Sequence, residues 1–215
     1  MATKLFLYLN IISSSLLAQK IIFDAKPMSF NEQDIRKELN IYPSSIISQC
    51  VEQVLVKELD DNTLGMSHCL FKSVDLNNKA TKQQLPEIIH HELSSMFLLN
   101  IDSGYSNKAF KYYQRKFYDL NPSDFNYDLN IGISIPIRVL TDEEKKYFVC
   151  NTYGMTHFEN DWNQICEALF TNPAFLQKIK TNMPVYKKAL LAIEFYHDRI
   201  DSKFTLEYFK DRLSN

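Results

Sequence analysis

Apolar residues recur at helical spacing in the middle of the chain, between residues 81 and 99. The row that shares one helix face consists of Leu85, Ile89, Leu93 and Met96. Further apolar residues beside this row widen the face, so that the helix presents hydrophobic side chains to more than one neighbour. The preceding segment Thr81–Gln84 has the pattern of a capping box, which indicates where the helix begins. The pattern predicts a central, buried helix.

The segments on either side of this helix predict the rest of the fold. Residues 51–59 and 66–74 are rich in Val and Leu and flank a turn signal, which predicts two strands paired in a small antiparallel sheet. Helical patterns follow at residues 107–117, 159–170, 183–199 and 205–213, and another helix begins near Pro173. We expect a predominantly helical α+β fold with the small β-sheet packed beside the central helix, in one domain over residues 19–215.

The first 18 residues resemble a secretory signal peptide. Lys4 provides a positive start, the stretch from Leu5 to Leu17 is mostly apolar, and Ala18 offers a small residue for cleavage. Such a short apolar stretch is not a convincing membrane span. We expect a secreted or periplasmic protein that keeps no stable membrane span once the signal is removed. The alternative is an ordinary N-terminal core helix.

Charge and composition narrow the possible partners. The formal net charge is −2, so the chain lacks the basic surplus of a nucleic-acid-binding domain. Residues 31–54 mimic the helices of a winged-helix regulator, but residues 43–55 include no Lys or Arg to contact phosphates. The four glycines and the lack of a glycine-rich phosphate motif argue against a doubly wound nucleotide-binding fold. We therefore expect no nucleic-acid partner.

The four cysteines are scattered singly, at Cys50, Cys69, Cys150 and Cys166. Without a C-x-x-C pair they indicate neither a structural zinc ribbon nor a thioredoxin-type redox site. Their even number permits disulfides in an exported protein, and four free thiols are the other interpretation.

The central helix carries a concentration of ionisable residues, namely Glu87, His90, His91 and Glu92. Zinc peptidases place H-E-x-x-H on a helix, because residues four apart share a face and can hold one metal. His91 and Glu92 supply the first half of this motif, and Ser95 stands at the position of the second histidine. The simpler alternative is a polar cluster on an ordinary helix.

A second block, from Tyr153 to Pro173, contains a predicted helix with a polar stripe at Glu159, Asn163 and Glu167. Together with the block from His90 to Phe97, it resembles secreted bacterial zinc metallopeptidases of the gluzincin, or zincin-like, type. The resemblance implies a zincin-like fold, a zinc cofactor, and hydrolysis of a peptide or protein substrate by metal-activated water.

Carried over by position, the resemblance makes His91 the first zinc ligand and Glu92 the general base on the metal-bound water. It makes Glu159 the third ligand and Tyr153 the partner of the developing oxyanion. Asp161 competes with Glu159, because the sequence leaves the register of the second helix open.

Ser95 departs from the family pattern, since a neutral hydroxyl is a poor zinc ligand beside imidazole. His157 is the best candidate to supply the missing donor. His90 is the next, although it lies about 100° around the helix from His91. If neither histidine fills the place, the protein is an inactive zincin-like binding or envelope protein. We expect a zinc-dependent metallopeptidase, with that inactive binding protein as the alternative.

Overall fold

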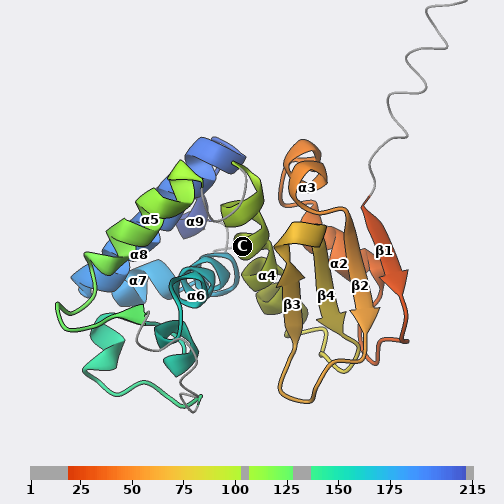
Figure 1. The fold of residues 1–215 in the computed structure, drawn as a ribbon, viewed down its shortest axis with the longest axis horizontal. Helices are drawn as coiled ribbons and strands as arrows, with labels where there is room; N and C mark the ends of the chain where they lie inside the picture. Colours follow the sequence, from red (N-terminus) through yellow and green to blue (C-terminus); the bar gives the residue numbers. More distant parts are fainter. Residues whose placement is uncertain (1–18, 103–106, 128–136, 212–215) are drawn as a thin grey trace, which may run out of the picture.

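The computed structural model describes residues 19–102, 107–127 and 137–211. Its architecture is α+β, as predicted, with a four-stranded sheet beside a mostly helical remainder (Figure 1). The strands are β1 (Lys20–Phe23), β2 (Gln53–Lys57), β3 (Gly65–His68) and β4 (Ser73–Asn77). The helices are α2 (Glu32–Leu39), α3 (Ser44–Cys50), α4 (Leu85–Asn100), α5 (Lys108–Tyr118), α6 (Phe158–Thr171), α7 (Phe175–Ile179), α8 (Met183–Phe195) and α9 (Leu206–Asp211). The predicted signal segment, residues 1–18, lies outside the described residues.

The sheet is mixed, and the predicted antiparallel pairing of residues 51–59 with 66–74 is wrong. β2 lies between β1 and β4 and is parallel to both, with Val54 opposite Ile21 and Val74. The predicted second strand is two strands, because the chain turns through a 3-10 helix at Cys69–Phe71 and Lys72 adopts a left-handed φ of 48°. β3 therefore lies antiparallel to β4, at the edge of the sheet.

Helix α4 is the central element, and it begins at Leu85, directly after the turn Thr81–Gln84 that the sequence marks as its start. In this turn the Thr81 N–H donates to Gln84 Oε1 and the Gln84 N–H donates to Thr81 Oγ1, the reciprocal pair of a capping box, while Gln84 itself is the N-cap of α4. α4 lies between the sheet and α6 and also contacts α2 and α3 (Figure 1). Twelve of its 16 residues are buried, so that different faces of one helix meet different neighbours.

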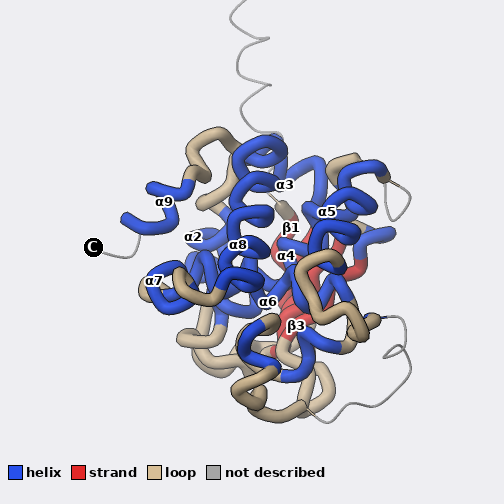
Figure 2. Tube along the Cα trace, turned by 90° about the vertical axis from the view of Figure 1, so that its left-hand side faces the viewer, coloured by secondary structure: helices blue, strands red, loops and turns tan. Residues whose placement is uncertain are grey.

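Helices α5 to α9 occupy the positions that the sequence predicts, on the side of α4 away from the sheet (Figure 2). Aromatic side chains fill the core between them, with Trp162 of α6 packed against Tyr113, Phe117 and Phe195. Buried hydrophobic residues run without interruption from the sheet to these helices. The core thus joins both layers through α4.

All four cysteines are described, and all are free thiols. Of the helices in the described ranges, none combines the length and the apolar character needed to cross a membrane.

Candidate functional site

A pocket of about 500 Å³ opens where the start of β3, the first half of α4 and the segment before α6 meet. Its chemically active lining residues are Glu87, His91, Glu92, Tyr153 and Glu167. The other lining residues that the structure describes are uncharged, so they include no Lys or Arg. Three of the predicted site residues therefore surround one cavity, from two different parts of the chain.

His91 is held by a carboxylate of α6. Its Nδ1 lies 3.0 Å from Glu167 Oε2, and the two side chains are 16% and 21% exposed. Burial disfavours the charged imidazolium, but the hydrogen bond to Glu167 and the nearby carboxylates of Glu92 and Glu159 raise the pKa of His91 above its ordinary value. The imidazole is thus oriented by one carboxylate and biased toward protonation.

Glu92 points from α4 toward strand β3. Its carboxylate accepts hydrogen bonds from the hydroxyl and the backbone N–H of Ser67, and the side chain is 9% exposed. Burial raises the pKa of Glu92, and the charge of Glu159 raises it further, although His91 and Ser67 oppose the shift. Gly65 makes this approach possible, because a Cβ at Gly65 would lie 2.5 Å from Ile88 Cγ2 and 3.0 Å from Glu92 Oε1.

Tyr153 lines the pocket from the segment that precedes α6. It lies in a 3-10 turn, Thr152–Met155, and its ring stacks on the imidazole of His91 with centroids 6.1 Å apart. Asn151 Oδ1 accepts the Tyr153 N–H and also the side-chain amide of Gln164, which ties the turn to α6. Burial raises the pKa of Tyr153, so the phenol keeps its proton at neutral pH.

Ser95 does not face the pocket as a metal donor but joins α4 to α6. Its hydroxyl accepts a hydrogen bond of 2.7 Å from Asn163 Nδ2, and Ser94 Oγ donates to Asn163 Oδ1 at 2.6 Å. Ser94, Ser95 and Asn163 are all buried. Because His91 contacts Glu167 while Ser95 contacts Asn163, the two helices run antiparallel along a polar seam.

The other predicted donors lie in different places. His157 is the N-cap of α6, where its Nδ1 accepts the Glu159 N–H. His90 is buried on another face of α4, between the hydroxyl of Tyr42 and the carboxylate of Glu38. Asp161 is fully buried against Lys188 and Tyr127. Of the two carboxylates weighed as the third ligand, Glu159 rather than Asp161 lies within electrostatic reach of His91 and Glu92.

The donor set does not match a catalytic zinc site. Such a site uses three protein ligands and leaves one position open. Within the described ranges, no three His, Cys, Asp or Glu side chains are placed to hold one metal ion. His91 and Glu167 are a pair of donors in contact, while Ser95 is engaged by Asn163 and His157 by the start of α6.

Glu167 is the residue whose role the sequence left unassigned. It lies eight positions after Glu159, on the same polar stripe of α6, and that spacing was the available signal. The spacing identifies the face but does not say which residue of the stripe lies level with His91. Which residue of the stripe meets His91 depends on how far α6 is shifted along α4.

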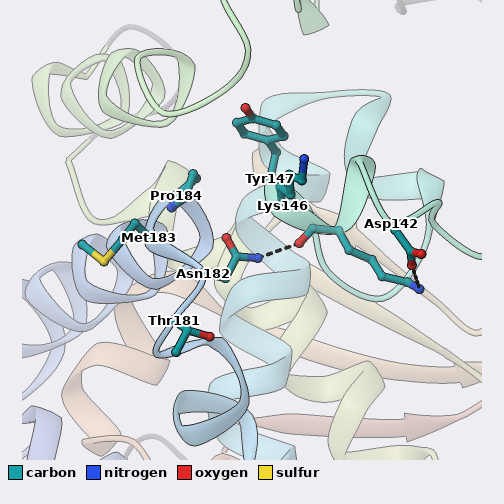
Figure 3. A pocket seen from close by; sticks show the side chains of 8 residues that line it. Asp142, Lys146, Tyr147, Thr181, Asn182, Met183 and Pro184 are labelled. Carbon is teal, nitrogen blue, oxygen red and sulfur yellow. Dashed lines mark hydrogen bonds and ion pairs between the residues drawn. The ribbon is translucent and has the colours of Figure 1, made fainter.

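A second hollow, of about 560 Å³, lies between residues 142–147 and 181–184 (Figure 3). Asn182 Nδ2 donates to the carbonyl oxygen of Lys145, and the Lys145 ammonium pairs with Asp142. Lys146 pairs with Glu143 in the same way. Because these charges neutralise each other at the surface, the hollow offers less chemistry than the pocket of His91.

Comparisons of this chain with protein-family models, with curated proteins and with solved structures find no match.

Proposed function

We propose that this protein binds an extended peptide segment that carries a positive charge, with the charged group in the pocket of His91. The observation that carries the proposal is the lining of this pocket: Glu87, Glu92 and Glu167 contribute three carboxyl groups, and no Lys or Arg is among the described lining residues. A lysine or arginine side chain, or a terminal ammonium, would complement this charge.

The edge of the sheet supplies a place for the peptide backbone. Among the strands in the described ranges β3 pairs only with β4, and the Leu64 carbonyl accepts from the Asn77 N–H, on the β4 side. Since backbone groups alternate along an antiparallel strand, those of Gly65 and Ser67 are directed toward the other side. The carboxylate of Glu92 accepts a hydrogen bond from the Ser67 N–H, and Gly65 lines the pocket. An added strand would therefore pair at Gly65.

Peptide hydrolysis is the second candidate, and the contact between His91 and Glu167 favours it. In its neutral form, a histidine oriented by a carboxylate can accept a proton from water, and a carboxyl group with a raised pKa, as in Glu92, can protonate a leaving amine. The position of α4 between the sheet and α6 also supports a zincin-like scaffold, as the resemblance implies. The two-donor pair gives less support to zinc as cofactor.

The binding proposal is tested with fluorescein-labelled octapeptides that differ only at a central Lys, Ala or Glu, by fluorescence anisotropy. We expect the Lys peptide to bind most tightly and Glu167→Gln to weaken it several-fold, because one carboxylate of the pocket loses its charge. Glu207→Gln, a change at an exposed carboxylate of α9, is the matched control and should leave binding unchanged. Equal affinities for the Lys and Glu peptides would refute the proposal.

The same peptides separate binding from hydrolysis. Mass spectrometry after prolonged incubation detects cleavage, and Glu92→Gln should abolish it if Glu92 transfers a proton. Metal analysis of the purified protein accompanies this assay. Stoichiometric zinc together with cleavage that stops on chelation would establish the metallopeptidase and overturn binding as the main activity.

A further inference from the structure

Two large aliphatic side chains line the pocket of His91 beside its carboxyl groups. Leu64 is 37% exposed and Ile137 is 67% exposed, and both belong to the lining. Single exposed apolar residues are common on protein surfaces, but these two share a concave site with three carboxyl groups. A cavity of about 500 Å³ is in the range that holds a drug-sized ligand, which is larger than one lysine side chain. The pocket therefore has room and apolar surface for a second side chain.

The acidic and the aliphatic parts of the lining come from different elements. Glu87 and Glu92 belong to α4 and Glu167 belongs to α6, so the carboxyl groups are carried by the two helices. Leu64 directly precedes β3, and Ile137 lies in a separate loop segment. A single ligand can therefore meet negative charge on the helices and apolar surface on the segments beside them.

Backbone hydrogen bonds hold the segment of Ile137 in place. The Arg138 N–H donates to Thr152 Oγ1 at 3.1 Å, and the Thr152 N–H donates to the Arg138 carbonyl at 3.1 Å. Val139 forms an isolated antiparallel bridge with Asn151 beside these bonds. Because Ile137 directly precedes Arg138, its side chain is attached to a backbone that the turn before α6 already positions. Ile137 is thus a fixed part of the pocket lining.

The geometry of an extended peptide decides which of its residues can use the aliphatic surface. In a β-strand, successive side chains point to opposite faces, and side chains two positions apart lie about 7 Å apart on one face. A spherical cavity of about 500 Å³ would be roughly 10 Å across, which accommodates two side chains at that spacing. When a basic side chain enters the pocket, the residue next to it therefore points away, and the residue two positions along points into the same pocket.

We propose that the peptide bound in the pocket of His91 carries a large aliphatic residue two positions from its basic residue. Leu64 and Ile137 contact the aliphatic side chain, while the carboxyl groups of the two helices receive the positive charge. This inference rests on the proposed function, because the basic residue is what places the peptide in the pocket. It adds a second determinant of the ligand, which is apolar and depends on spacing.

Peptides of identical composition test the spacing. Fluorescein-labelled octapeptides with one central Lys carry one Leu either two positions from the Lys, on the amino or the carboxyl side, or directly next to it, in an otherwise constant background. By fluorescence anisotropy, one of the two peptides with the two-residue spacing should bind about fivefold more tightly than the peptides with adjacent Leu, because its aliphatic side chain leaves water. Equal affinities, with Lys still preferred over Glu, would overturn this inference and leave the proposed function standing. Loss of the preference for Lys would overturn both.

A pair of variants tests the surface that receives the aliphatic side chain. Ile137→Ser should remove most of the advantage of the two-residue spacing, while a peptide with Lys and no Leu should bind as tightly as it binds the unchanged protein. Val139→Ser is the matched control, since Val139 is 76% exposed two residues further along but is not among the described residues that line the pocket. An equal effect of the two variants on the spacing preference, or no effect of either, would overturn the assignment of Ile137.

Discussion

Lys188 should be the most sensitive single position of the helical layer. Its side chain is fully buried, and its ammonium donates to Asp161 at 2.6 Å, to Asn121 at 2.6 Å and to the carbonyl of Tyr147 at 2.7 Å. The ammonium also lies 4.5 Å from the ring centroid of Phe148. Lys188→Met keeps the apolar stem but leaves the Asp161 carboxylate buried without its cation. Breaking such a pair costs about 3–5 kcal/mol.

This cost is a large part of the roughly 5–15 kcal/mol that stabilises a typical protein. At about 2–4 °C per kcal/mol for a chain of this size, the melting temperature should fall by about 6–20 °C. Circular dichroism melts of the Lys188→Met protein measure the loss, with Lys187→Met, at an exposed neighbour, as the control. The double variant with Asp161→Asn should recover part of the loss. A drop no larger than that of the control would refute the reasoning.

Three further predictions concern the pocket and the seam behind it. Gly65→Ala would place a Cβ 2.5 Å from Ile88 Cγ2 and 3.0 Å from the Glu92 carboxylate, so we expect a loss of about 1–3 kcal/mol in the free energy of unfolding and weaker binding of the Lys peptide. Undisturbed binding would contradict the placement of the peptide. Asn163→Ala removes the partner of the buried Ser95 hydroxyl and should lower the free energy of unfolding by about 1–3 kcal/mol, and no measurable change would show that the seam is not stabilising. The pKa values of His91 and Glu92 are both raised, so these side chains lose protons and the pocket becomes more negative as the pH rises through those pKa values. Fluorescence anisotropy should therefore show tighter binding of the Lys peptide at about pH 8 than at about pH 5. Tighter binding at the lower pH would contradict the charge argument.

Helical periodicity predicted the helices well, because their apolar spacing is local information. The reciprocal hydrogen bonds expected at Thr81–Gln84 form in the turn directly before α4, which begins at Leu85, and the pattern over 159–170 matches α6 closely. The strands and their pairing are harder to predict from the sequence. Residues 66–74 contain no Pro or Gly to signal a break, and the reversal depends on Lys72 in a left-handed conformation. Strand pairing was also beyond the sequence pattern, since β2 meets β4 only after the chain has passed through β3.

The candidate site was predicted in part. The proximity of His91, Glu92 and Tyr153 in one pocket agrees with the two sequence blocks that suggested it. The pairing of His91 with Glu167 depends on the axial shift between α4 and α6, and the spacing of residues within one helix carries no information about that shift. Ser95 and Asn163 show the same dependence, because each is an ordinary polar residue until the other is placed opposite it.

The two-sided anchoring of α6 has a consequence for motion. One side of the helix is bonded to α4 through Asn163 and Glu167, and the other is bonded to α8 through Asp161. Sliding or rotating α6 by one residue would break all three attachments together, so the helix should exchange its amide hydrogens only when the domain opens globally. The turn Thr152–Met155 is held to α6 through Asn151 and to Arg138 through Thr152. The ring of Tyr153 itself is 37% exposed at the pocket, so a ligand that enters should displace this ring while the helices behind it stay in place.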